Sequence, residues 1–130
     1  MRFRWGAVAA AALASWAVSV AWYMVFGTTW AELVALPTEW EFEIGTVLLG
    51  LFFNAVLALG VAVVLRAAGA RGAAAGARWG LALALLLLVP AHAGKWVWQD
   101  KPLLFAIDAG GHVLCLLAAG AILGWRSRPD

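Results

Sequence analysis

The chain has 130 residues, of which 65% are hydrophobic and only 12% are charged, and its formal net charge is +2. This composition excludes an ordinary soluble domain, whose charged fraction is about 25%, and indicates one integral membrane domain over residues 1–130. The lipid bilayer is therefore the expected environment, and nucleic acid is not an expected partner.

Four apolar segments are each long enough for a membrane-spanning helix, which needs about 20 residues. Their expected bounds are 5–26, 41–65, 79–98 and 103–125. Helices are expected because lipid offers no hydrogen bonds to the backbone, and because the chain lacks the alternating segments of a membrane barrel. The predicted fold is an all-α, integral membrane four-helix bundle.

The first segment ends in the aromatic residues 22–26. An alternative interpretation is a cleaved signal peptide, but the apolar run is longer than a usual signal core, which favours a retained first helix. Beyond it, Thr29 and Glu32 have the spacing of a capping box. This spacing predicts a short interfacial helix over residues 30–36, ended by Pro37.

The later segments carry their own boundary signals. Residues 66–78 are small and basic, which predicts a plain loop between the second and third spans. Within the third span, Pro90 lacks a backbone donor and is expected to kink the helix or free the carbonyl of Leu86. Asp100 is the expected N-cap of the fourth span.

The distribution of basic residues predicts the orientation. Only Lys95 and Lys101 would lie on the side away from the termini. The positive-inside rule therefore predicts that both termini are cytoplasmic. The arginines on the terminal side are Arg2, Arg4, Arg66, Arg71, Arg78, Arg126 and Arg128. The tryptophans are expected to form two interfacial belts, with Trp5, Trp79 and Trp125 in the inner one and Trp30, Trp40, Trp96 and Trp98 in the outer one.

Two stretches of the chain resemble a known family. Residues 22–30, WYMVFGTTW, resemble the WY-x-x-FG-x-x-W signature of a family of small four-helix bacterial membrane proteins called domain of unknown function 1761. The closing segment is also similar, in KPL at 101–103, IDAGGH at 107–112 and GAILGW at 120–125. Asp108 stands where that family more often has Asn, and Gly111 where it more often has Tyr. The resemblance implies a four-helix bundle in the bacterial inner (plasma) membrane and no established activity.

Polar residues inside the apolar segments mark the candidate site. A charge in the hydrocarbon region is costly unless it is paired, wetted or neutralised, so Asp108 and His112, four residues apart on one helix face, are the first candidates. A tight turn joins the third and fourth spans, which should place His92 level with Asp108. The expected lining of a pocket in the outer half is Tyr23, Glu43, Asn54, His92, Lys95, Asp108 and His112.

Two functions fit such a cluster. A pocket containing a carboxylate and imidazoles could bind or pass a proton, a metal or a small polar solute, which is the function we expect, with transport as one form of it. Alternatively, Asp108 and His112 only hydrogen-bond to each other or to Asn54 and fix helix packing, as in a structural or accessory subunit. His92 alone also fits a packing role, and Lys95 would then extend outward to the interface.

No cofactor is expected, and an enzyme is not the favoured class. Two histidines and one carboxylate from only two helices are a weak metal-ligand set, and haem between His92 and His112 has equally little support. No serine lies in a nucleophile elbow, and Cys115 has no activating base beside it in the sequence.

Glycine spacing predicts close helix contacts. Gly120 and Gly124 form a small-xxx-small step, and Gly72, Gly76 and Gly80 continue this spacing in the third segment. Because four short helices enclose little volume, such faces also predict a homo-oligomer.

Overall fold

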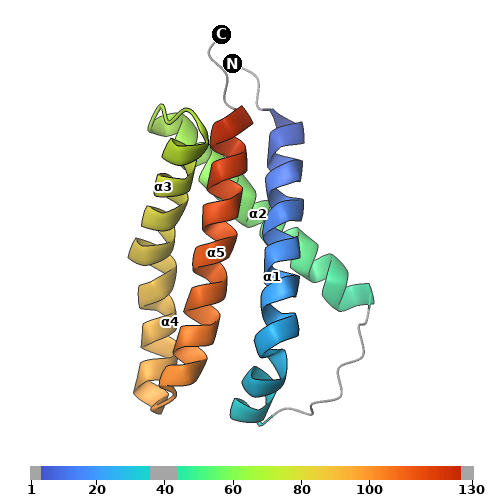
Figure 1. The fold of residues 1–130 in the computed structure, drawn as a ribbon, viewed down its shortest axis with the longest axis vertical. Helices are drawn as coiled ribbons and strands as arrows, with labels where there is room; N and C mark the ends of the chain where they lie inside the picture. Colours follow the sequence, from blue (N-terminus) through green and yellow to red (C-terminus); the bar gives the residue numbers. More distant parts are fainter. Residues whose placement is uncertain (1–3, 36–43, 127–130) are drawn as a thin grey trace.

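The computed structural model describes residues 4–35 and 44–126, and these residues form helices joined by short turns (Figure 1). The elements are α1 (Trp5–Leu33), α2 (Ile44–Ala67), α3 (Ala73–Leu83), a π-helical turn η1 (Ala84–Leu88), α4 (Val89–Trp96), a 3₁₀ turn η2 (Val97–Gln99) and α5 (Pro102–Arg126). The segments from α3 to η2 form one continuous helical rod. Because every element of the described ranges is helical, the expected all-helical fold is confirmed.

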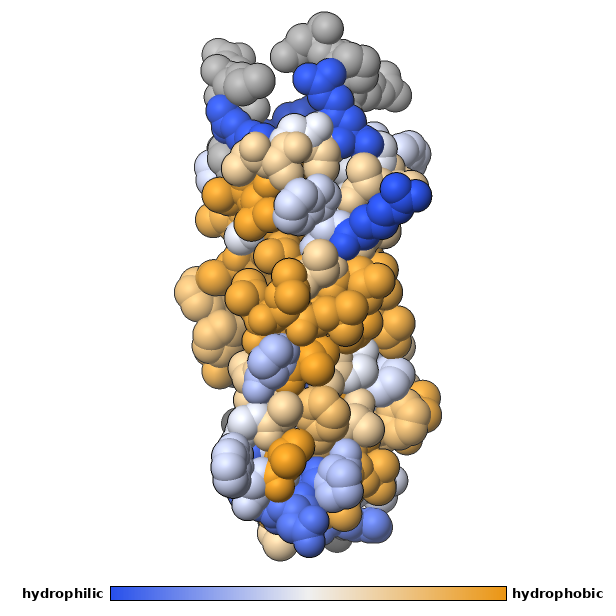
Figure 2. Space-filling model, turned by 90° about the vertical axis from the view of Figure 1, so that its left-hand side faces the viewer, coloured by the Kyte–Doolittle hydropathy of each residue, from blue (hydrophilic) through white to orange (hydrophobic). Residues whose placement is uncertain are grey.

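Within the described ranges, four helical stretches are long and apolar enough to cross a membrane, namely Trp5–Leu33, Ile44–Ala67, Ala73–Gln99 and Pro102–Arg126. The start of α1 and the end of α5 lie at the same end of the molecule, which we call the proximal end (Figure 1). The opposite end, at Leu33 and Pro102, is the distal end. A hydrophobic band separates two more hydrophilic ends on the face shown in Figure 2.

The hydrophobic core lies in the proximal half and consists mainly of small side chains. Helix α5 is central, because it packs against α1, α2, α3 and α4. Alanine at the contact positions lets the helix backbones approach closely, and the burial of these apolar groups stabilises the bundle. The core residues are Ala7, Val8, Ala11, Ala12, Ala58, Val61, Leu65, Ala84, Leu116, Ala119 and Leu123.

Glycines on α3 and α5 face each other at the closest helix contact. A Cβ atom at Gly76 would collide with the backbone oxygen of Gly120, and one at Gly80 would collide with that of Leu116. The N–H of Gly72 donates to the carbonyl oxygen of Gly124 at 2.9 Å. The small-xxx-small faces are therefore occupied within one chain, and they do not remain free to pair two copies.

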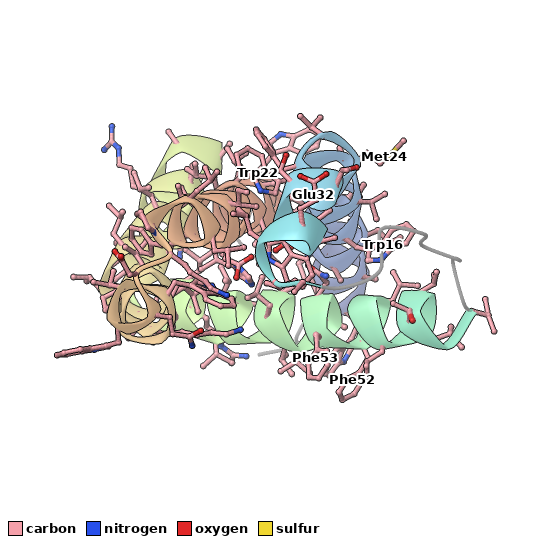
Figure 3. The ribbon with its side chains drawn as sticks, turned by 90° about the horizontal axis from the view of Figure 1, so that it is seen from below. Trp16, Trp22, Met24, Glu32, Phe52 and Phe53 are labelled. Carbon is pink, nitrogen blue, oxygen red and sulfur yellow. The ribbon has the colours of Figure 1, made fainter. Side chains whose placement is uncertain are left out.

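Helix α2 diverges from the rest of the bundle towards its N-terminus (Figure 1). Its contact with α1 includes Gly50, where a Cβ atom would lie 3.3 Å from the indole nitrogen of Trp16. Viewed from the distal end, Trp16 lies on the side of α1 from which α2 departs (Figure 3). The divergence leaves an open wedge between α1 and the N-terminal half of α2.

The prediction of a separate interfacial helix over residues 30–36 is wrong. Helix α1 runs without interruption through Thr29 to Leu33, and residues 36–43 lie outside the described ranges. Two contacts hold these last turns in the bundle. Ala31 is fully buried, and the ammonium group of Lys101 donates to the carbonyl oxygen of Leu33 at 3.2 Å, where a cation caps the negative end of the helix dipole.

The third span begins at Ala73, within the segment 66–78 that was expected to be a loop. The chain needs only a short turn, because Gly69 and Gly72 adopt positive φ angles of 62° and 87° that glycine reaches without steric cost. The expected disturbance at Pro90 takes the form of the π-helical turn that directly precedes α4.

Asp100 is not the N-cap of α5. It has φ 54° and ends the 3₁₀ turn in a left-handed conformation, and α5 begins two residues later at Pro102. An N-cap residue has extended backbone and directly precedes the first helical residue, so Asp100 belongs to the reversal between the two rods.

Candidate functional site

The centre of the polar cluster is the carboxylate of Asp108, which lies on α5 and is only 5% exposed. Its Oδ1 accepts hydrogen bonds from the Tyr23 hydroxyl at 2.8 Å and from the indole N–H of Trp30 at 2.9 Å. Its Oδ2 accepts one from the indole N–H of Trp96 at 2.6 Å. Because an indole nitrogen only donates, Asp108 must be the acceptor, and an ionised carboxylate has the lone pairs that this set requires.

Neutral donors, together with one imidazole, surround the Asp108 carboxylate. Among the described residues, its only ion-pair contact is with Nδ1 of His92, 4.0 Å from Oδ2. Hydrogen bonds to a charged group contribute about 1.5–3 kcal/mol each, so three donors offset much of the cost of removing the carboxylate from water. Aromatic donors, and not a direct bond to lysine or arginine, therefore hold this side chain among the residues that the structure describes.

Two histidines continue the network from Asp108. Nδ1 of His112 lies 2.8 Å from the backbone carbonyl oxygen of Asp108 and 3.1 Å from Nε2 of His92. Since a carbonyl oxygen only accepts, the hydrogen-bond network assigns a hydrogen to Nδ1 of His112 and makes Nε2 of His92 an acceptor. In these neutral tautomers, Nδ1 of His92 carries its own hydrogen and points its donor towards Asp108.

A small hollow of about 90 Å³ adjoins this network between α1, α2 and α5. Nε2 of His112 has no hydrogen-bond partner in the described part of the chain, where every buried polar side-chain atom has one. This nitrogen is therefore not buried. Because His112 is among the residues that line the hollow, we assign Nε2 to the wall of the hollow. The lining comprises Ser19, Tyr23, Phe53, Asn54, Leu57, Gly111, His112 and Cys115.

A larger groove of about 530 Å³ occupies the wedge between α1 and α2. It shares Ser19 and Tyr23 with the hollow, so the two spaces adjoin. Its lining is mainly apolar, with Thr28, Trp30 and Thr46 as further polar residues. The groove offers a route from the surface to the hollow.

The structure brings four of the predicted site residues into contact, namely Tyr23, His92, Asp108 and His112. Asn54 lines the hollow, where it accepts a hydrogen bond from the Ser15 hydroxyl at 2.6 Å and donates one to the backbone oxygen of Gly50 at 2.9 Å. Glu43 lies outside the described residues.

Lys95 lies outside the hollow lining. Its ammonium group lies 4.2 Å from the centre of the Trp96 ring, a cation–π contact on the same indole that donates to Asp108. The lysine therefore lies near the carboxylate without a direct ion pair to it among the described residues.

The expected direct bond between the side chains of Asp108 and His112 is replaced by a bond to the backbone. The imidazole contacts the carbonyl oxygen of Asp108, while the carboxylate contacts aromatic donors from α1 and α4. The His92 and His112 rings touch directly, with centroids 4.7 Å apart, so haem between them would require the rings to separate. Within residues 4–35 and 44–126, no group of three or more His, Cys, Asp or Glu residues is arranged to hold a metal.

Three site tryptophans were not among the predicted site residues. Trp30 and Trp96, expected in an interfacial belt, donate to Asp108 instead, and Trp96 is only 6% exposed. Trp22 donates to the backbone oxygen of Ile107 at 2.9 Å and packs on Gly111, where a Cβ atom would lie 2.9 Å from the indole. Tyr23 and Trp30 are seven residues apart, two helical turns on one face, which is the signal that could have paired them.

An all-helical chain with four helices of spanning length around a buried carboxylate has the architecture expected of a small multi-pass membrane protein. A family model described as "Protein of unknown function (DUF1761)" matches residues 6–124. The chain therefore belongs to this family, as the sequence resemblance indicated. Neither a curated protein nor a solved structure matches the chain.

Proposed function

We propose that this protein is a multi-pass membrane protein that binds a small polar solute in the hollow between α1, α2 and α5. One observation carries the proposal. The hollow is lined by polar groups with unused hydrogen-bonding capacity, namely Nε2 of His112, the hydroxyl of Ser19 and the lone pairs of the Tyr23 oxygen. Such groups are costly in a bilayer and are usually retained for a ligand, an ion or water.

Asp108 acts in this proposal as an anchor and not as a direct ligand. Three donors and His92 already surround its carboxylate. The carboxylate fixes the hydroxyl of Tyr23 and, through its backbone carbonyl, the ring of His112. These two side chains then present their remaining lone pairs to the hollow, so the contact residues for a solute are Tyr23 and His112.

The position of the core supports binding more directly than passage. Small buried residues such as Ala58 and Ala119 pack the proximal half, whereas the groove between α1 and α2 opens beside the hollow. A solute could enter through the groove without a change in the core. Passage to the proximal side would require α2 or α5 to move.

The alternative is a structural or accessory membrane subunit. The observation in its favour is that Asp108 is fully hydrogen-bonded by residues of the same chain, as expected of a residue that only fixes helix packing. This role needs no solute in the hollow, so ligand binding separates the two functions.

A binding screen tests the proposal. The purified full-length chain in detergent is heated with ammonium, methylammonium, formamide, urea or acetate, which sample cationic, neutral and anionic solutes of suitable size. A solute at about 100 times its Kd should stabilise the fold by about 2.7 kcal/mol, seen as a rise in Tm. Ser19→Ala and His112→Gln should remain folded and lose this response.

Leu114→Ala is the matched control for the screen. Leu114 lies on α5 two residues beyond His112, is 41% exposed and is not among the hollow-lining residues. It should keep the full ligand response. If no solute raises the Tm of the wild type, the hollow is not a binding site, and the accessory role becomes the better account.

We also propose that both termini face the cytoplasm and that the membrane is the bacterial plasma membrane. Arg66, Arg71 and Arg78 cluster where α2 ends and α3 begins, on the proximal side, and the positive-inside rule assigns this side to the cytoplasm. Single cysteines in a Cys115→Ser background at Ala70 and at Gln99 should differ in labelling by an impermeant maleimide in intact cells. Gln99 should react and Ala70 should not, and the reverse result would invert the topology.

A further inference from the structure

We infer that the solute of the hollow is a small cation carrying N–H donors, of the ammonium or methylammonium class. The inference rests on the proposed binding role of the hollow and adds the chemical class of its ligand. It follows from the hydrogen-bonding pattern, the charge and the size of the site.

The groups fixed around the hollow mainly offer acceptors. The Tyr23 hydroxyl donates its only hydrogen to Asp108, so its oxygen can offer a ligand only lone pairs. Nε2 of His112 carries a lone pair and can only accept, because the hydrogen of the neutral ring is on Nδ1. The thiol of Cys115 donates to the backbone oxygen of Ser15 at 3.4 Å, which leaves its sulfur as a weak acceptor. A ligand with several N–H donors satisfies these groups together.

The remaining donors at the hollow are fewer. Asn54 uses its amide oxygen for Ser15 and one N–H for Gly50, which leaves a single N–H. The hydroxyl of Ser19 can donate or accept. An anion would therefore meet one or two donors and three acceptors, which is an unfavourable arrangement.

The local charge also favours a cation. Among the described residues, the titratable groups that line the hollow are Tyr23, His112 and Cys115, and His92 and Asp108 lie behind them. The ammonium group of Lys95 lies over the face of the Trp96 ring, whose N–H edge contacts the carboxylate, so this lysine offsets part of the negative charge. An ionised Asp108 polarises the Tyr23 hydroxyl that donates to it, which makes the phenol oxygen a better acceptor for a cation.

The hollow has room for a small cation. A water molecule takes up about 30 Å³ in the liquid, so a hollow of about 90 Å³ admits an ammonium ion, which is close to water in size, together with one or two waters. Methylammonium fits in place of the ion and one water, whereas tetramethylammonium carries the charge but no N–H donor for the acceptors. The Phe53 ring also lines the hollow and can contribute a cation–π contact.

A proton competes with the cation for the same lone pair. Because Nδ1 of His112 already carries a hydrogen and Nε2 of His92 faces it, an added proton is accommodated at Nε2 of His112, on the hollow side. Protonation both removes the acceptor and adds a like charge.

The test is calorimetric titration of the full-length protein in detergent with ammonium chloride, methylammonium chloride, tetramethylammonium chloride, formamide and sodium chloride, at about pH 8 and about pH 5.5. Ammonium and methylammonium should bind at the higher pH, and the other three should not. Binding should be weaker at the lower pH, where protons compete for Nε2 of His112. His112→Gln should reduce the affinity and flatten this pH dependence.

Phe53→Leu and Phe52→Leu form a matched pair that avoids the hydrogen-bond network. Figure 3 shows the two rings side by side on α2. They are similarly exposed, at 58% and 60%, but only Phe53 is among the residues that line the hollow. Phe53→Leu should weaken ammonium binding roughly two- to fivefold, and Phe52→Leu should leave it unchanged.

Each contrary result has a distinct meaning. If formamide binds in a His112-dependent manner and ammonium does not, the cation class is wrong although the hollow still binds a solute. If His112→Gln leaves ammonium binding unchanged, Nε2 of His112 is not its acceptor and the assigned geometry is wrong. If none of the compounds binds, both this inference and the proposed function are wrong.

Discussion

Gly76→Ala should lower the free energy of unfolding by about 3 kcal/mol or more, although it adds a single methyl group. The new Cβ atom would collide with the backbone oxygen of Gly120 and lie 2.9 Å from Cα of Gly124. Both are backbone atoms of α5, so no side chain can rotate away to make room. The two helices must separate, and they lose contacts along their whole length.

Gly94→Ala is the control for this substitution. Gly94 lies in the same rod as Gly76, and a Cβ atom there would meet nothing within 4 Å. Alanine has a higher helix propensity than glycine, so Gly94→Ala should be neutral or slightly stabilising. Unfolding followed by circular dichroism in detergent measures both variants. Equal stability of the two would show that α3 and α5 are not in backbone contact at Gly76.

Asp108→Leu should cost about 3–5 kcal/mol or prevent folding, because it leaves three buried donors without an acceptor. Asp108→Asn should cost less, about 1–3 kcal/mol. Its amide oxygen can still accept from Tyr23 and Trp30, but its NH₂ group faces the N–H of Trp96, and both are donors. This conflict arises only at the position of Oδ2, so the Asn variant tests the contact with Trp96 separately from the contacts at Oδ1.

A double-mutant cycle isolates the contact between Asp108 and Trp96. In the Asp108→Asn background, Trp96→Phe removes the opposed N–H and should cost less than Trp96→Phe in the wild type. Unfolding free energies of the four proteins give the coupling. Additive effects would mean that the 2.6 Å hydrogen bond does not contribute to stability. Trp98→Phe, at an 88% exposed position, controls for the loss of an indole.

Hydropathy was sufficient to predict the four helices of the described ranges that are long and apolar enough to cross a membrane, because a helix in lipid needs an apolar run of minimum length. Boundaries were less accurate where contacts between helices override local signals. Thr29 and Glu32 match a capping box, yet the burial of Ala31 and the hydrogen bond of Trp30 to Asp108 keep α1 helical to Leu33. The segment 66–78 was assigned to a loop because it is small and basic, although its Gly72 and Gly76 continue the glycine spacing that packs on α5.

Only part of the candidate site could be predicted from the sequence. Asp108, His92 and His112 stand out because ionisable residues are costly inside apolar segments. Their partners could not be identified, since a tryptophan near a span end fits an interfacial belt equally well. Whether these tryptophans face the membrane interface or donate to Asp108 depends on the rotation of α1 and α4 about their axes. Only tertiary packing fixes that rotation.

The central position of α5 has a consequence for biosynthesis. This helix is made after α1 and α4, yet it carries the acceptor for Tyr23 and Trp30 of α1 and for Trp96 of α4. Until α5 packs against them, the earlier helices hold unsatisfied donors and exposed glycine faces, so a nascent chain that lacks α5 has no stable assembly. Completion of the fold is therefore coupled to the synthesis of α5.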